Sequence, residues 1–185
     1  RRTHYSKELD TSMAGSDATV MGWISSIRGH GNITFLTLVD KMGAIQVVAK
    51  KGESPDDLVQ SISKLKEHSS IGLIGTVKTS EKAPNGIEIS PKDLRIFSSV
   101  EKIPPFDPHA KTVKNIDTRL EIRAIDLRRR TLQQVFNARS NVLKSIRQYF
   151  YEQNFTEINT PKMIATATEG GAALFPIFYY NKEAF

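Results

Sequence analysis

Turn signals between residues 18 and 100 limit the possible folds of this chain more than any other feature. Clusters of glycine, asparagine and proline break the stretch into short segments in which apolar and polar residues alternate, as they do in half-buried strands. After the third segment, Ser54 is predicted to cap a helix whose first residue is Pro55. The predicted strands cover residues 18–28, 33–40, 44–50, 70–79 and 86–97.

Three strands, a helix and two strands are the order of a five-stranded OB barrel, a fold class that commonly binds oligonucleotides on its second and third strands. Phe35 and Gln46 are the candidates for such contacts, because alternation places both among polar neighbours on one face. An aromatic ring stacks on an unpaired base, and an amide both donates and accepts at a base edge. A packed Phe35 and a solvated Gln46 are the competing interpretation.

The charge distribution also favours a polyanionic partner. The chain has 26 Lys and Arg against 20 Asp and Glu, and residues 111–147 alone hold ten basic and three acidic side chains. A concentrated positive field suits nucleic acid, although a solvated helix face gives the same pattern. The absence of cysteine excludes a disulfide scaffold and a thiolate zinc site, and no metal site is predicted. No apolar run is long enough to span a bilayer, and we expect a cytoplasmic protein.

A change of character after residue 100 predicts a second domain. Residues 101–117 contain three prolines among charges, which predicts a linker between an OB domain at 1–100 and a domain at 118–185. The second domain is expected to open with an amphipathic helix over 131–154 and a strand over 155–158. Residues 162–185 show no clear period and end on an apolar residue with no stop signal soon after the long helix, so this domain is expected to be incomplete.

Two short strings could carry chemistry without specifying it. Residues 166–171 combine a carboxylate with two glycines, which suits a tight backbone around an ammonium group but also an ordinary surface turn. Residues 126–130 hold three arginines that could contact phosphate or pair with acidic groups across an interface. No Ser/His/Asp arrangement and no GxxxxGK[ST] loop can be assembled, so no catalytic residue is predicted and a P-loop NTPase is excluded.

Several motifs succeed one another along essentially the whole chain: Arg2–Ser6, Gly22–Trp23, Phe35–Leu36, Gly43–Gln46, Asp117–Leu120, Asp126–Arg129, Phe155–Lys162 and Ala165–Pro176. In this order they resemble the class II aminoacyl-tRNA synthetases of the aspartyl, asparaginyl and lysyl subclass. The last run narrows the resemblance to the archaeal-type aspartyl group. The resemblance implies a barrel that binds the tRNA anticodon, followed by the start of an α+β catalytic domain.

The resemblance also implies roles for single residues of the barrel. Phe35 would stack on the middle anticodon base, a uridine in this subclass, and Gln46 would read its edge. Arg28 and Glu88 would make further anticodon contacts. Strict members of the group carry a bulky aromatic residue and a lysine where this chain has Ser25 and Pro84, which implies relaxed recognition of both tRNA(Asp) and tRNA(Asn).

In the second domain, the long helix and Pro161 would form motif 1, which builds a homodimer interface in the family. Leu132, Val135 and Phe136 would serve that interface, and Glu169 would contact the amino group of substrate L-aspartate. The implied activity is aspartate–tRNA ligation, in which ATP converts L-aspartate to an adenylate that is transferred to tRNA. Because the family's ATP and Mg²⁺ groups lie further along the sequence, neither is expected to bind here, and this stretch alone is expected to be inactive.

Other interpretations stay open from the sequence. An asparaginyl- or lysyl-tRNA synthetase would share the barrel and motif 1. A non-catalytic OB-fold module would bind single strands without regard to the anticodon. A paralogue such as archaeal asparagine synthetase lacks the barrel, so residues 18–100 count against it.

Overall fold

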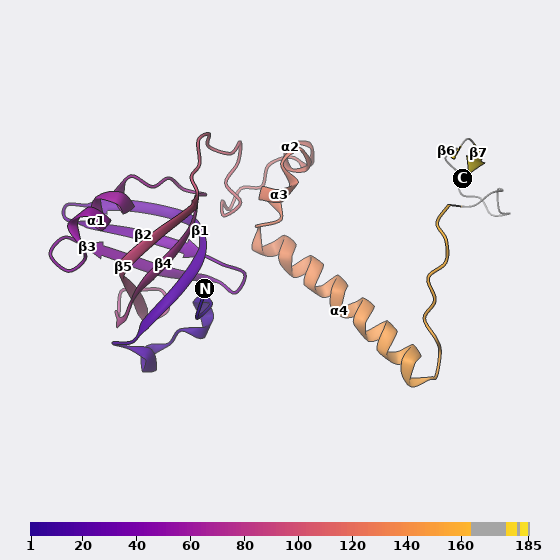
Figure 1. Ribbon diagram of the computed structural model, residues 1–185, viewed down its shortest axis with the longest axis horizontal. Helices are drawn as coiled ribbons and strands as arrows, with labels where there is room; N and C mark the ends of the chain where they lie inside the picture. The colour runs from indigo at the N-terminus through magenta and orange to yellow at the C-terminus, as the bar shows by residue number, and fades with distance from the viewer. Residues whose placement is uncertain (164–176, 181, 185) are drawn as a thin grey trace. The chain divides into compact units, whose positions relative to one another are not determined.

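Five strands of the first half pair into a closed barrel, as predicted (Figure 1). The computed structural model describes residues 1–163, 177–180 and 182–184, which fall into two compact units, 1–129 and 130–185. The order around the barrel is β1-β2-β3-β5-β4, and an antiparallel β1–β4 pair closes it. The strands are β1 (Asp17–His30), β2 (Ile33–Val39), β3 (Ala44–Lys50), β4 (Ser70–Thr79) and β5 (Ile87–Ser98).

Side-chain alternation divides β2 and β3 into an inner and an outer face. Leu36 and Leu38 of β2 and Ile45 and Val47 of β3 point inward and are fully buried. The residues between them are partly or fully exposed on the outer face. The predicted period-two pattern is therefore confirmed, and it places the polar positions of both strands on one surface.

Helix α1 (Asp56–Ser63) packs against β2, β3 and β5 and contributes Leu58 and Ile62 to the core. The predicted cap was wrong by one residue, because Pro55 has extended dihedral angles and is itself the N-cap. The hydroxyl of Ser54 is buried without a hydrogen-bond partner among the described residues, so it caps nothing.

The residues before β1 are held against the barrel through the turn between β2 and β3. Short 3₁₀ turns form at Ser6–Glu8 and Thr11–Met13. Buried Asp40 accepts hydrogen bonds from the backbone N–H and hydroxyl of Ser6 at 2.7 and 2.8 Å. It also accepts the N–H groups of Met42 and Gly43 in the turn, so one carboxylate joins two segments far apart in sequence.

Residues 99–115 are irregular, and two short helices come after them, α2 (Ile116–Glu121) and α3 (Arg123–Asp126). The side-chain oxygen of Asn115 accepts the N–H of Thr118 at 3.1 Å and so caps α2. Both helices belong to the same compact unit as the barrel. The domain boundaries at residues 100 and 117 stay a prediction.

The second unit begins with α4 (Arg130–Glu152), which confirms the predicted long helix. Among its described residues none is buried, and its apolar stripe is exposed. Residues 155–158, predicted to be a strand, are not one: they have no pairing partner in the part of the chain that the structure describes. Instead Glu157 accepts a hydrogen bond from Tyr151 at 2.9 Å, which holds the segment beside the helix. Two short strands, β6 (Ile177–Tyr179) and β7 (Lys182–Ala184), form a hairpin.

Candidate nucleic-acid interface

The outer face of the barrel brings together the four residues expected to contact an anticodon. Phe35 on β2 lies opposite Arg28 of β1, and Gln46 on β3 lies opposite Glu88 of β5. Arg28 is exposed, whereas the other three are half-buried. Because Phe35 is not part of the core, the interpretation of it as a packed core residue was wrong. Four strands therefore supply one surface with an aromatic ring, an amide, a cation and a carboxylate.

A hydrogen bond orients the amide on this surface. The Nε2 of Gln46 donates to the Oε2 of Glu88 at 3.3 Å. An ionised carboxylate only accepts, so this bond directs the amide nitrogen toward Glu88 and the amide oxygen away from it. The Gln46 oxygen can then accept a hydrogen bond from a ligand above Phe35.

An ion-pair triad borders the same face. Glu53 binds Lys50 at 2.5 Å and Lys78 at 2.8 Å, and Lys78 lies opposite Glu88 in the β4–β5 pairing. Hydrogen bonds from Lys50 and Lys78 and the charges of both lysines lower the pKa of Glu53 to about 2. The carboxylate thus stays charged at neutral pH, and the triad of Glu53, Lys50 and Lys78 carries one net positive charge.

Ser25 and Pro84, the positions expected to affect tRNA choice, lie at irregular points of the barrel. Ser25 is the extra residue of a β-bulge in β1, where pairing shifts between Ile24 and Ser26. Its hydroxyl donates to the carbonyl of Thr37 at 3.3 Å. Pro84 is exposed in the loop between β4 and β5, where it offers no N–H to a ligand.

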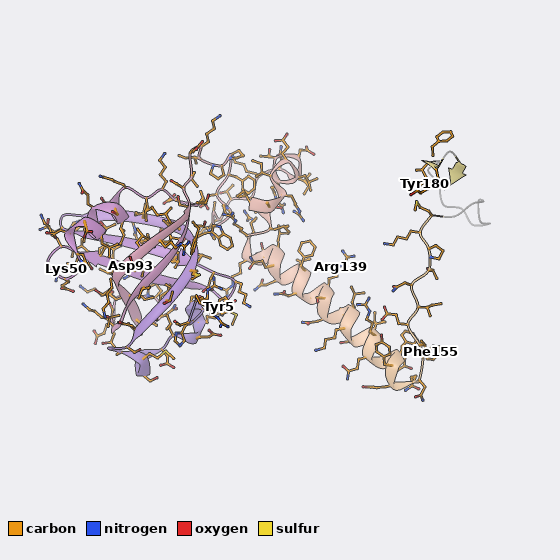
Figure 2. The ribbon with its side chains drawn as sticks, viewed as in Figure 1. Tyr5, Lys50, Asp93, Arg139, Phe155 and Tyr180 are labelled. Carbon is orange, nitrogen blue, oxygen red and sulfur yellow. The ribbon has the colours of Figure 1, made fainter. Side chains whose placement is uncertain are left out.

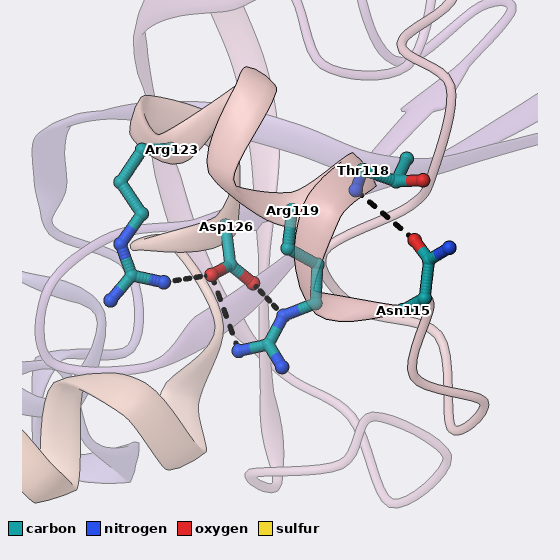
Figure 3. Close-up of polar contacts among 5 residues, drawn as sticks. All are labelled: Asn115, Thr118, Arg119, Arg123 and Asp126. Atoms are coloured by element: carbon teal, nitrogen blue, oxygen red, sulfur yellow. Dashed lines mark hydrogen bonds and ion pairs between the residues drawn. The ribbon is translucent and has the colours of Figure 1, made fainter.

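Asp126, the first residue of the arginine-rich string, is the centre of an ion-pair cluster with two arginines that precede the string (Figure 3). Asp126 is completely buried, and its carboxylate accepts Nε and Nη2 of Arg119 at 2.8 and 3.2 Å and Nη1 of Arg123. Burial disfavours the charged carboxylate, but the hydrogen bonds and charges of both arginines outweigh it and lower the pKa of Asp126. The arginines of this cluster precede the string, so the two roles left open for Arg128–Arg130, phosphate contact or pairing across an interface, stay a prediction.

Arg128 joins this cluster to the barrel. Its guanidinium lies 4.5 Å from the ring centre of Trp23, which is 38% exposed on β1 two residues before the bulge. Burial lowers the pKa of Arg128, yet an arginine stays charged at neutral pH. Sequence reasoning missed this contact, as it missed the triad around Glu53, because no local pattern links residues so far apart.

The expected interface residues of the second unit lie on or just after α4. Val135 and Phe136 are exposed, Leu132 is half-buried, and Pro161 is exposed beyond the helix. Glu169, expected to contact the substrate amino group, lies outside the described residues. Its role stays a prediction.

Neither a metal centre nor a membrane segment is found in the described part of the chain. No three His, Cys, Asp or Glu side chains there gather closely enough to hold a metal ion among themselves. No described helix is both long and apolar enough to cross a bilayer.

Two family models match different parts of the chain. Residues 18–97 match the OB-fold nucleic acid binding domain, and residues 115–185 match the class II tRNA synthetases of the D, K and N type. Aspartate–tRNA(Asp/Asn) ligases of Methanocaldococcus jannaschii and Methanothermobacter thermautotrophicus are 45% and 46% identical over all 185 residues. The chain spans 42% of the length of each of these relatives.

Solved structures share the fold. Asparaginyl-tRNA synthetase from Pyrococcus horikoshii, in complex with asparaginyl-adenylate, superposes on the whole chain with a TM-score of 0.87 at 24% identity. The chain covers 42% of that structure. Aspartyl tRNA synthetase from Entamoeba histolytica matches 88% of this chain, which covers 39% of that one, with a TM-score of 0.79 at 26% identity.

Proposed function

The chain belongs to the class II tRNA synthetases of the D, K and N type, and from this premise we propose that it supplies the anticodon-reading barrel and the first part of the catalytic domain of an aspartate–tRNA ligase. The ligase converts L-aspartate and ATP to aspartyl-adenylate and pyrophosphate, and it then transfers the aspartyl group to the 3′ end of tRNA with release of AMP. The names of the archaeal relatives support this activity. The enzyme is proposed to use ATP and Mg²⁺, held by residues of its catalytic domain outside this stretch, and to work in the cytoplasm.

The observation that carries the proposal is the surface formed by Arg28, Phe35, Gln46 and Glu88. Phe35 stacks under the middle anticodon base, and the oriented amide of Gln46 reads its edge. A uracil offers an N–H donor at that edge, which matches the outward amide oxygen of Gln46, whereas cytosine offers an acceptor there. Arg28 pairs with a neighbouring phosphate or base.

We further propose that the enzyme charges both tRNA(Asp) and tRNA(Asn). Ser25 and Pro84 support this, because a small bulge residue and a proline without an N–H leave few groups to select the third anticodon base. The Asp/Asn names of the relatives support it independently. Glu169 is proposed to hold the ammonium group of L-aspartate.

The exposed apolar face of α4 supports a homodimer, with Leu132, Val135, Phe136 and Pro161 in the interface. Exposed apolar surface of this kind marks a protein contact in soluble proteins.

Binding of the 185-residue chain to three anticodon stem-loops, carrying GUC, GUU and GCC, tests the proposal. We expect tight binding of GUC and GUU and weak binding of GCC at about 0.1 M salt. Phe35→Ala should weaken GUC binding by about 5- to 150-fold, the equivalent of one lost base stack of about 1–3 kcal/mol. Phe97→Ala is the matched control, since Phe97 is a half-exposed ring elsewhere on the barrel, packed over Gly72.

The other outcomes separate the alternatives. Binding of GUC alone contradicts charging of tRNA(Asn) but keeps the aspartyl assignment, whereas GUU alone indicates an asparaginyl enzyme. Equal binding of all three loops indicates a generic OB module and contradicts anticodon reading.

A further inference from the structure

We propose that the start of the chain forms a second RNA contact: Arg2, Tyr5, Lys7 and Lys41, here called the N-terminal patch, bind the phosphate backbone of the RNA whose anticodon lies on β2 and β3. This inference rests on the proposed function for the identity of the RNA. The chemistry of the N-terminal patch itself requires only a polyphosphate strand.

The N-terminal patch is fixed to the barrel. Thr3 is hydrogen-bonded to β1: its N–H donates to the carbonyl of Thr19 at 3.0 Å, and its hydroxyl accepts the N–H of Thr19 at 2.8 Å. Ser6 is held by buried Asp40, directly before Lys41. These bonds order the segment before any ligand arrives, so binding there costs little conformational entropy.

Tyr5 gathers two cations at this point. The guanidinium of Arg2 lies 4.2 Å from the ring centre of Tyr5, and Nζ of Lys41 lies 4.4 Å from it. Hydrogen bonding to Lys41 and Arg2 lowers the pKa of Tyr5, which reflects how close both charges are. Lys7 lies over the same turn, because a Cβ built on Gly43 would meet its Cγ at 3.3 Å.

No described carboxylate forms an ion pair with any of these three cations. The acidic groups nearby are used otherwise: Asp40 accepts four hydrogen bonds, and Glu8 accepts the N–H of Tyr5 at 2.8 Å. Nη2 of Arg2 donates to the carbonyl of Met21 at 2.9 Å, but its buried Nε has no partner among the described residues. Preordered cations without a carboxylate partner, beside an aromatic ring, are what a phosphate needs.

The position of the N-terminal patch suits a strand that crosses the anticodon face. Lys41 lies just beyond the end of β2 and six residues from Phe35, roughly 20 Å along an extended chain. The other end of β3 carries Lys50 and Lys51, and Figure 2 shows Tyr5 and Lys50 on opposite sides of the barrel. RNA bound over Phe35 and Gln46 would therefore meet positive charge at both ends of the strand pair.

Salt-dependent binding of the GUC stem-loop by the 185-residue chain tests the proposal. Lys41→Gln should make the plot of log binding constant against log salt concentration shallower by about 0.7. Relative to its effect at 1 M salt, the substitution should therefore weaken binding about fivefold more at 0.1 M salt. The loss should be equal for the GUC and GCC loops, because a phosphate carries no sequence information. Lys41→Arg should keep the slope, and Lys66→Gln, at an exposed lysine after α1, is the matched control. Arg2→Gln should act in the same direction, with a melting curve to check its bond to Met21.

The outcomes for the two proposals are distinguishable. If the unchanged chain prefers GUC over GCC, but Lys41→Gln binds GUC with unchanged affinity and unchanged salt dependence, the proposed phosphate contact is overturned. The proposal that the barrel reads the anticodon then stands. If the unchanged chain does not prefer GUC, yet Lys41→Gln weakens both loops, anticodon reading fails and the N-terminal patch stands as a phosphate contact.

Discussion

Replacing Asp126 by asparagine should destabilise the folded arrangement of α2 and α3. The carboxylate of Asp126 is fully buried and is the shared acceptor of Arg119 and Arg123. Asparagine keeps the volume but loses the charge and turns one acceptor into a donor that faces a guanidinium. Both arginines would then lose their buried counter-ion.

The size of the effect depends on how much water reaches the arginines. Breaking a fully buried ion pair costs about 3–5 kcal/mol, because one charge is left without compensation. Here the side chains of Arg119 and Arg123 are 16% and 35% exposed, so both can partly rehydrate. We therefore expect a loss at the lower end, about 3 kcal/mol.

The tryptophan fluorescence of the chain reports this change directly. Trp23 is the only tryptophan and lies under Arg128, two residues beyond Asp126. Urea unfolding followed by Trp23 fluorescence should move to lower urea in Asp126→Asn, while Glu121→Gln, at an exposed carboxylate of α2, should not move it. A loss below about 1 kcal/mol, no more than an ordinary neutral hydrogen bond, would refute the reasoning.

The pH dependence gives the same test a second readout. The folded pKa of Asp126 is lower than the 3.8 of a free carboxyl, so its stabilisation is complete above that value and is lost as pH falls through the folded pKa. The difference between the unchanged chain and Asp126→Asn should therefore close below about pH 4.

Three further predictions concern other parts of the molecule. Gly22→Ala should cost about 3 kcal/mol in urea unfolding, because its Cβ would lie 2.3 Å from the carbonyl oxygen of Val39, whereas Gly29→Ala meets nothing within 4 Å and should be neutral. The carboxyl of Glu53 should titrate near pH 2 by NMR, and a midpoint near pH 4.5 would contradict the triad. The contribution of Glu53 to the free energy of unfolding is complete above pH 4.5 and is lost as pH falls through about 2. Val135→Asp should give a monomer by sedimentation with the barrel still folded by Trp23 fluorescence, because a dimer would bury the new charge at a position that is 61% exposed in the single chain; Asn141→Asp is the control.

The barrel could be predicted from the sequence because its signals are local. Alternation over Ile33–Val39 and Ala44–Lys50 has a period of two, and the turns between strands carry glycine, asparagine and proline. Pairing partners are not local, so the closing β1–β4 pair and the bulge at Ser25 were not predicted. The strand expected at 155–158 failed for the same reason, since extended backbone is a strand only when another segment pairs with it.

Two of the four residues of the candidate interface could also be predicted from a local pattern. Alternation along β2 and β3 indicates Phe35 and Gln46, and the register then places Arg28 and Glu88 beside them. The bonds that set their surroundings connect distant residues: Lys78 and Glu53 are 25 positions apart, and Ser6 and Asp40 are 34 apart. No periodic pattern contains such pairs, because each depends on one donor meeting one acceptor in the folded chain.

The charge of residues 111–147 could not by itself decide between a nucleic-acid contact and a solvated helix face, because some of these arginines make contacts within the chain. One buried carboxylate, Asp126, pairs with two arginines of this segment, Arg119 and Arg123, and the half-buried Arg128 lies over the ring of Trp23. Beyond this point, α4 presents an apolar stripe that no described residue buries. Most of the stability of a helix in a protein comes from packing of its apolar face, so α4 depends on a surface outside these described residues. The barrel has its own core and the N-terminal patch its own anchoring hydrogen bonds, so the proposed RNA binding can be tested on this chain without a partner for α4.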